Sequence, residues 1–158
     1  MKSLLFLLAS TLLVVIACGS SSTAKGNSAT NACTLLTQAE VSAAVGAAVN
    51  AGVYEGPGAP NCTWTAASGA AATLNYPEDP GQVGQIPAGA QHMSGVSLVK
   101  VDGLGDAADY TVVGTISAEL DVRKGSQAFQ MDIGNDKASQ AQIEAGEKTL
   151  ATLVLTRI

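Results

Sequence analysis

The sequence feature that most constrains the fold is a regular alternation of apolar and polar residues along two adjoining segments. Residues 115–123 and 129–133 place an apolar side chain at every second position, and a turn sequence at 124–126 separates them. The apolar members are Ile116, Ala118, Leu120, Val122, Phe129, Met131 and Ile133. Because successive side chains of a strand point to opposite faces, this pattern predicts an antiparallel hairpin with one buried and one solvated face.

A short helix is expected over Gln38–Val45. Thr37 and Glu40 have the spacing of a capping box, in which the hydroxyl accepts from a first-turn amide and the carboxylate reaches back. Gly46 follows the last apolar residue and is a natural stop for the helix. Leu35 and Leu36 are expected to pack just before it.

A second helix is expected over about residues 139–156. Ser139 and Gln142 form another possible capping box. The predicted apolar face comprises Ile143, Leu150, Leu153 and Val154. The residues expected outside it are Glu144, Glu147 and Lys148.

Further strands complete a sheet. They are expected over residues 62–65, 72–76, 96–101 and 109–113, with a short turn at Ser68 and Gly69 between the first two. Residues 78–95 contain prolines and glycines without periodicity, and we expect an irregular loop that covers a sheet edge. The order of elements predicts an α+β fold, with a mainly antiparallel sheet packed by an N-terminal and a C-terminal helix.

The first eighteen residues have the build of an export signal. Lys2 gives a positive start, residues 4–16 are an apolar run, and small Ala17 precedes Cys18. The run is shorter than the roughly twenty residues that span a bilayer, so we expect a signal peptide over 1–17. The junction resembles the lipobox of bacterial lipoproteins, whose cysteine receives diacylglycerol and then an amide-linked acyl chain such as palmitate. The alternative is an ordinary secretory signal in which Cys18 is incidental.

The segment after this junction predicts a flexible tether. Residues 18–31 are small and polar, and residues 32–158 have a length suited to a single domain. The formal charge is −5, and removal of Lys2 with the leader makes it −6. This acidic balance argues against nucleic acid and against an anionic membrane surface, so membrane contact is expected through the lipid on Cys18 alone.

Two cysteines remain once Cys18 is assigned to lipid. Cys33 and Cys62 would then lie in an oxidising compartment, where disulfides persist. We expect a disulfide between them; the alternative is two buried thiols that never meet. A metal site is not expected, because zinc takes four close ligands and His92 is the only histidine.

Several short motifs are similar to one family. They are residues 31–41, which contain a C-x-L-L-T-x-x-E start, the Cys62-Thr63-Trp64 triplet, residues 103–108 and the C-terminal helix. Together they resemble small envelope lipoproteins of actinobacterial type that carry a domain of unknown function. The similarity covers nearly all of residues 33–158. It implies an α+β domain stapled by two cysteines at the cell surface, and it carries over no catalytic residues.

Two polar segments are candidate ligand sites. Residues 103–108 formally match G-x-G-x-x-A, but a strand rather than a helix is expected to follow, which favours a glycine turn over a nucleotide site. Asp102, Asp106 and Asp109 could gather around calcium. Such a site needs six or more oxygen ligands, so a solvated acidic turn is the preferred interpretation.

Catalytic and apolar sites have weaker support. His92 with Ser94, or the pair Glu78 and Asp79, could serve a hydrolase, but the chain has no G-x-S-x-G elbow and adjacent carboxylates usually point apart. The aromatic residues considered are Tyr54, Trp64, Tyr76 and Tyr110. We expect them in or near the core; if they lined one open face, they would bind an apolar ligand or partner.

The sequence therefore predicts a lipid-anchored extracytoplasmic lipoprotein rather than an enzyme. We expect a non-catalytic binding domain for an envelope protein partner or a small apolar ligand, with no cofactor. The alternative is a structural or accessory subunit of an envelope complex, and an envelope hydrolase comes third.

Overall fold

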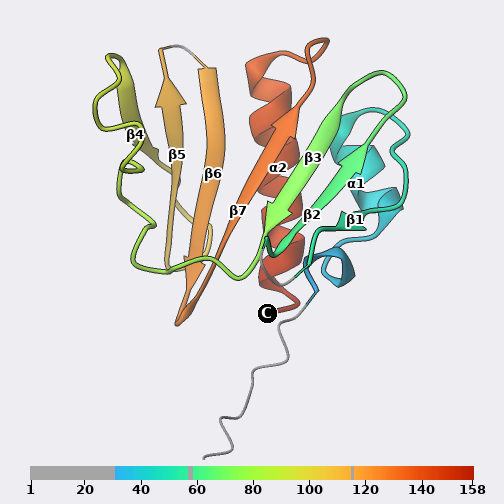
Figure 1. Ribbon diagram of the computed structural model, residues 1–158, viewed down its shortest axis with the longest axis horizontal. Helices are drawn as coiled ribbons and strands as arrows, with labels where there is room; N and C mark the ends of the chain where they lie inside the picture. The colour runs from blue at the N-terminus through green and yellow to red at the C-terminus, as the bar shows by residue number, and fades with distance from the viewer. Residues whose placement is uncertain (1–30, 57–58, 115) are drawn as a thin grey trace, which may run out of the picture.

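Within residues 31–56, 59–114 and 116–158, which the computed structural model describes, seven strands form one antiparallel sheet. For residues 116–118 only the backbone is described. The strands are β1 (Val53–Tyr54), β2 (Asn61–Thr65), β3 (Ala71–Asn75), β4 (Val96–Lys100), β5 (Ala107–Val113), β6 (Ile116–Lys124) and β7 (Gln127–Gly134). Their order across the sheet is β1-β2-β3-β7-β6-β5-β4, so the C-terminal strand β7 lies at the centre (Figure 1).

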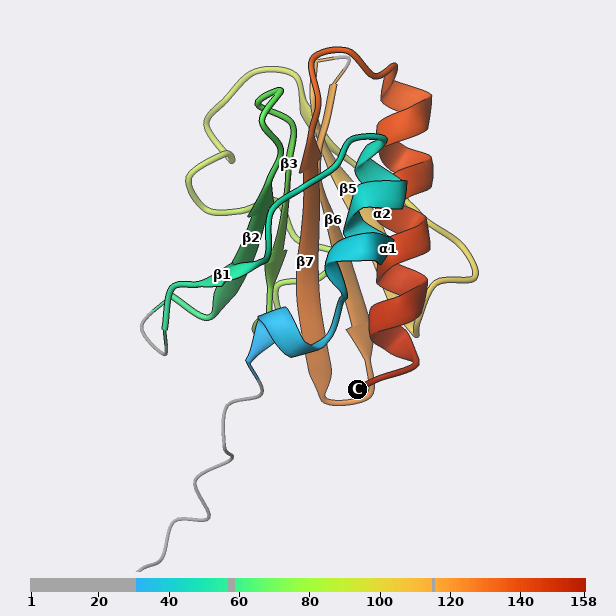
Figure 2. The ribbon, with the colours of Figure 1, turned by 90° about the vertical axis from the view of Figure 1, so that its right-hand side faces the viewer.

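Two helices cover one face of this sheet. They are α1 (Gln38–Val45) and α2 (Gln140–Leu155), and a 3-10 turn over Ala32–Thr34 precedes them. Figure 2 shows both helices on the same side of the sheet, where α2 packs on β6 and β7 and α1 packs on β3 and α2. The predicted α+β class, with an antiparallel sheet and helices near both ends of the domain, is confirmed.

Both helices begin at the predicted capping boxes. The Glu40 amide donates to the Thr37 hydroxyl at 3.3 Å, and the Thr37 amide donates to the Glu40 carboxylate at 2.8 Å. Ser139 and Gln142 repeat this arrangement at the start of α2. Helix α1 ends at Gly46, whose φ of 72° lies in the left-handed region that favours glycine.

The expected hairpins are present with slightly longer strands. β6 pairs with β7 through Leu120 opposite Met131 and Val122 opposite Phe129, and β2 pairs with β3. The short strand β1 was not predicted, because two residues carry no periodicity. The pairing of β3 with β7, which brings Ala72 opposite Ile133, was not predicted either. It joins segments about sixty residues apart, and local pattern does not report such contacts.

The core fills the space between the sheet and the helices. Its largest fully buried side chains include Trp64, Leu74, Tyr110, Leu120, Phe129, Met131 and Leu150. They come from alternate positions of five strands and from α2, as the period of two in the strands requires. Leu35 and Leu36 are also buried, which confirms their expected packing before α1.

One prediction about α2 is wrong. Glu147 was expected outside the apolar face, but the residue is only 1% exposed. The amide of Ile133 donates to Glu147 Oε1 at 3.0 Å. The carboxyl group is therefore buried because it accepts a backbone hydrogen bond from β7.

Candidate functional site

The sheet face turned away from the helices is polar. In register across the sheet, Lys100, Asp109, Asp121, Gln130, Asn75 and Asn61 form one row, and each neighbour in it lies on the adjacent strand. Beside this row, Thr111 is opposite Glu119, and Asp132 is opposite Thr73. We call this side of the sheet the polar face. Four carboxyl groups from three strands thus share it: Asp109, Glu119, Asp121 and Asp132.

The loop over residues 78–95 covers part of the polar face. It contains no helix or strand, as predicted. Figure 2 shows it on the side of the sheet opposite the helices. A Cβ built at its Gly84 would lie 4.0 Å from Oδ2 of Asp109, which is on the inner strand β5. The expectation that the loop covers a sheet edge therefore needs correction: at this point it covers the face.

A hydrogen-bond network links the centre of this face. Asn75 Nδ2 donates to Gln130 Oε1 at 2.6 Å. Gln130 Nε2 then donates to Glu119 Oε2 at 3.1 Å and to Asp121 Oδ1 at 3.3 Å. The amide nitrogen of Gln130 thus donates to carboxylates that would otherwise repel one another, although it carries no charge of its own.

Two buried groups next to this network lack partners. Asp109 is 6% exposed and Thr111 is 3% exposed, although no helix covers their face. Among the described residues, neither Asp109 Oδ1 nor Thr111 Oγ1 has a hydrogen-bond partner. A buried polar atom without a partner lowers the stability of the fold by about 1–3 kcal/mol. Such an atom therefore calls for an explanation.

Burial and mutual repulsion raise the pKa values of these acids. Burial, together with the charge of Asp109, raises the pKa of Asp121 to about 7. Burial also raises the pKa of Asp109, Glu119 and Asp132, and the Asp132 charge adds to the rise at Glu119. Glu78, at the start of the loop, has its pKa raised mainly by burial. We call Glu78, Asp109, Glu119, Asp121 and Asp132 the acidic cluster.

The sequence contained part of this signal. The alternation along residues 115–133 placed Glu119, Asp121 and Asp132 on the non-core face, where they were interpreted as solvated. Their neighbours on that face depend on the order β3-β7-β6-β5. Strand register and the position of the 78–95 loop bring these acids together. Neither can be predicted from the alternation of apolar and polar residues.

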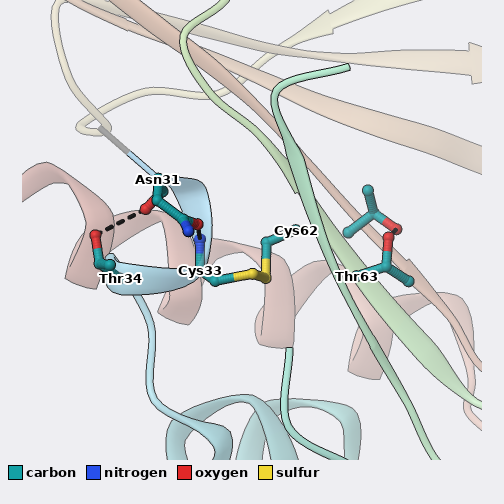
Figure 3. Close-up of a disulfide and its surroundings, with 6 residues drawn as sticks. Asn31, Cys33, Thr34, Cys62 and Thr63 are labelled. Atoms are coloured by element: carbon teal, nitrogen blue, oxygen red, sulfur yellow. Dashed lines mark hydrogen bonds between the residues drawn. A yellow bond between two sulfur atoms is a disulfide. The ribbon is translucent and has the colours of Figure 1, made fainter. Parts of the chain in front are cut away.

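The cysteine predictions divide between described and undescribed residues. Cys18 lies outside the described residues. Cys33 and Cys62 form a disulfide with a Cα–Cα distance of 5.0 Å (Figure 3). Asn31 caps the turn that carries Cys33, accepting from its amide at 2.9 Å. This bond joins the N-terminal segment to β2 and is structural.

The three aspartates weighed for calcium do not converge. Asp102 pairs with Lys100 at 2.9 Å, and Asp106 accepts from the Gly125 amide at 2.6 Å. Asp109 belongs to the polar face, as described above. Residues 103–108 connect β4 to β5, and Gly103 and Gly105 have φ of 78° and 61°. The preferred interpretation of this segment as a glycine turn is confirmed.

The other sequence candidates are dispersed. His92 and Ser94 are exposed in the 78–95 loop, and Asp79 is exposed beside Glu78. Trp64, Tyr76 and Tyr110 are buried in the core, as expected, so they do not form an open aromatic face.

The hollows on the helix side of the sheet are weaker candidates for a binding site. A shallow groove of about 860 Å³ runs between α1 and α2, and its walls include Ala43, Gly46, Ala145 and Thr149. A smaller hollow of about 430 Å³ lies beside β4, where Val99 and Lys148 contribute to its walls. Small and aliphatic residues provide most of the surface in the first, so the polar face is the stronger candidate site.

The polar face presents carboxyl, amide and hydroxyl groups from neighbouring strands. Within the described residues, no group of three or more histidine, cysteine or acidic residues is placed to hold a metal ion. None of the helices there is long and apolar enough to cross a membrane.

Comparisons with protein-family models, curated proteins and solved structures find no match to this chain.

Proposed function

We propose that this chain is a lipid-anchored extracytoplasmic lipoprotein whose domain is a non-catalytic binding module for an envelope partner. The leader and the Ala17–Cys18 junction support the location, and residues 18–31 supply a tether between lipid and domain. The binding surface is the polar face beside the 78–95 loop. The actinobacterial lipoprotein family remains the proposed relationship.

The observation that carries this proposal is the acidic cluster. Carboxyl groups placed opposite one another across strands destabilise a sheet, and here Asp109 lies opposite Asp121. The core does not use them, because they lie on the face away from both helices. Ionisable groups with strongly perturbed pKa values concentrate at functional sites, which favours a binding role for this face.

Binding fits the geometry better than hydrolysis does. Glycoside hydrolysis needs two carboxyl groups on either side of a sugar ring. Asp109 is shielded beneath the 78–95 loop, and Asp121 is tied to Gln130. Neither arrangement leaves both groups open to a substrate of that size.

Site-specific crosslinking in native envelopes tests the function. A photo-crosslinking residue at Thr73, which lies opposite Asp132 on the polar face, should capture a partner. The same residue at Thr152, an exposed position on α2, is the matched control and should capture much less. Equal capture at both positions, or capture only at Thr152, would contradict the proposed binding face and favour an accessory subunit that docks through its helices.

The anchor is tested in the same preparation. Cys18→Ser should abolish the mass increase from diacylglycerol and release the protein from the membrane fraction. It should also lower crosslinking at Thr73, because the domain is no longer held beside its partner. Retention of the Cys18→Ser protein in the membrane would contradict lipid anchoring.

A further inference from the structure

Two oxygen atoms on the polar side of β5 are free to accept hydrogen bonds. Asp109 and Thr111 are more than nine-tenths buried, and Asp109 Oδ1 and Thr111 Oγ1 are without hydrogen-bond partners in the described structure. Residues two apart on a strand project to the same face, so these two side chains are neighbours on the polar face.

The charge around these acceptors is unbalanced. The acidic cluster contributes five carboxyl groups, and the 78–95 loop above it contains no lysine or arginine. On the same face, Lys100 is engaged with Asp102, and Arg123 lies further along β6, opposite Ala107. The ion pairs found among the described residues are Lys100–Asp102 and Arg157–Glu40, and neither uses a member of the cluster.

We infer that the polar face binds a primary ammonium group, with Asp109 Oδ1 and Thr111 Oγ1 as hydrogen-bond acceptors and Asp121 as the third. This assignment rests on the proposed binding function and names its ligand chemistry. An ammonium has three donors and no acceptor, which matches three acceptor side chains at neighbouring positions of β5 and β6, where Asp109 lies opposite Asp121. Its charge would also relieve the repulsion between Asp109 and Asp121.

Other cations match the site less well. Calcium and magnesium take six or more oxygens, and the described residues hold no acidic group arranged for a metal. A guanidinium is broad and planar and prefers a bidentate carboxylate. The acceptors here come from separate side chains, and two of them are shielded from solvent, which favours a compact ammonium.

Access requires the loop to lift from the sheet. Both acceptor atoms are shielded from solvent, and Gly84 of the loop lies against the Asp109 carboxyl group. A bound ammonium should therefore change the surroundings of Gly84 as well as those of the two acceptors. The Gly84 amide gives the experiment a local reporter.

Amide NMR of the full chain in detergent tests the assignment. Titration with n-butylamine at pH 7 should shift the Gly84, Asp109 and Thr111 amides saturably, in the roughly millimolar range expected for one small ligand. The neutral isostere n-butanol should not. A second titration with Nα-acetyl-lysine methylamide separates the two sources of an ammonium. Tighter binding than n-butylamine indicates a lysine of a protein partner, and equal or weaker binding indicates a free amine.

Substitutions identify the acceptors. Asp109→Asn should weaken n-butylamine binding about tenfold or more, since a bond to a charged acceptor is lost. Thr111→Val keeps the side-chain shape and should weaken binding severalfold. Asp136→Asn changes an exposed acid after β7, and it is the matched control that should leave binding unchanged.

Three results would overturn the inference: no saturable shift at the reporter amides, an equal response to n-butanol, or an equal loss with Asp136→Asn. The proposed function is judged separately, by crosslinking at Thr73. Capture of a partner without amine binding would leave the binding role standing and remove only the ammonium. Amine binding without capture of a partner would support the ammonium site and contradict the proposed partner-binding role.

Discussion

Glu147 shows how one buried acid couples the helix layer to the sheet. Its Oε1 accepts from the Ile133 amide, while its Oε2 has no partner within the described residues. The nearby Tyr110 hydroxyl donates to the Glu144 carbonyl at 3.1 Å. Burial raises the pKa of Glu147 to about 8, so the folded protein keeps a proton that the unfolded chain releases above its ordinary pKa of 4.5.

The sign of this effect gives a prediction. Because the folded pKa is the higher one, the contribution of Glu147 to the free energy of unfolding is full below pH 4.5 and falls as pH rises towards 8. The steepest slope for one proton is about 1.4 kcal/mol per pH unit. Glu147→Gln keeps an oxygen for Ile133 and cannot ionise, so urea denaturation should show less loss of stability between pH 5 and 9.

The control for that measurement is Asp136→Asn. It removes an exposed carboxyl group and should retain the wild-type pH dependence, to which the acidic cluster also contributes. If Glu147→Gln lost as much stability as the wild type across this range, the carboxyl group would not be protonated in the folded protein.

The burial of Glu147 was not predicted because its helical spacing and its charge point in opposite directions. Glu147 follows Ile143 by four residues and precedes Leu150 by three, so helical spacing placed it on the apolar face. Its charge argued for solvent. The deciding fact is the Ile133 amide on β7, which requires an acceptor, and no local pattern in α2 reports it.

At the scale of elements, the close approach of α1 to α2 depends on a glycine. A Cβ built at Gly146 would lie 2.7 Å from the Ala44 carbonyl oxygen and 3.0 Å from Ile133 Cδ1. Real Cβ atoms do not approach backbone that closely, so α2 packs here because the side chain is missing.

Gly146→Ala should therefore destabilise the domain. Alanine gains roughly 1 kcal/mol in helix propensity, but overpacking against backbone costs typically 1–3 kcal/mol and is expected to outweigh it. Gly134→Ala is the matched control, because nothing lies within 4 Å of a Cβ there. Urea denaturation at pH 7 compares the two; a Gly146→Ala protein as stable as Gly134→Ala would show that α1 and α2 can separate at low cost.

The positions of most helices and strands could be predicted from the sequence, but the pairing of distant strands could not. The capping boxes at Thr37 and Ser139 located both helices, and alternation located β6 and β7. Pairing of β3 with β7 and the placement of the 78–95 loop over Asp109 involve contacts between distant segments. Individual carboxylates of the candidate site could thus be assigned to the polar face from the sequence. Their proximity to one another depends on the strand order and could not be predicted.

Over the whole molecule, the disulfide is the main covalent constraint on the described chain. Cys33 and Cys62 are separated by 29 residues in sequence. Closing a loop of that length restricts the unfolded chain and contributes roughly 3.5 kcal/mol on the chain-entropy model. The exported location that we propose would keep it oxidised.

Replacing both cysteines by alanine should lower the free energy of unfolding by about this amount. A reductant should lower the stability of the wild-type protein to a similar degree and leave the double variant unchanged. Urea denaturation with and without reductant measures both effects. Stability that is indifferent to reductant in the wild type would mean that the bond does not form in the isolated protein.

The same bond also determines where a mechanical load enters the domain. If a lipid holds Cys18, tension in the tether arrives at Cys33 and passes through sulfur directly to Cys62 in β2. That strand is paired with β1 on one side and β3 on the other, so two ladders share the force. A pull from the membrane is thereby directed past α1, which would otherwise be among the first parts to unfold.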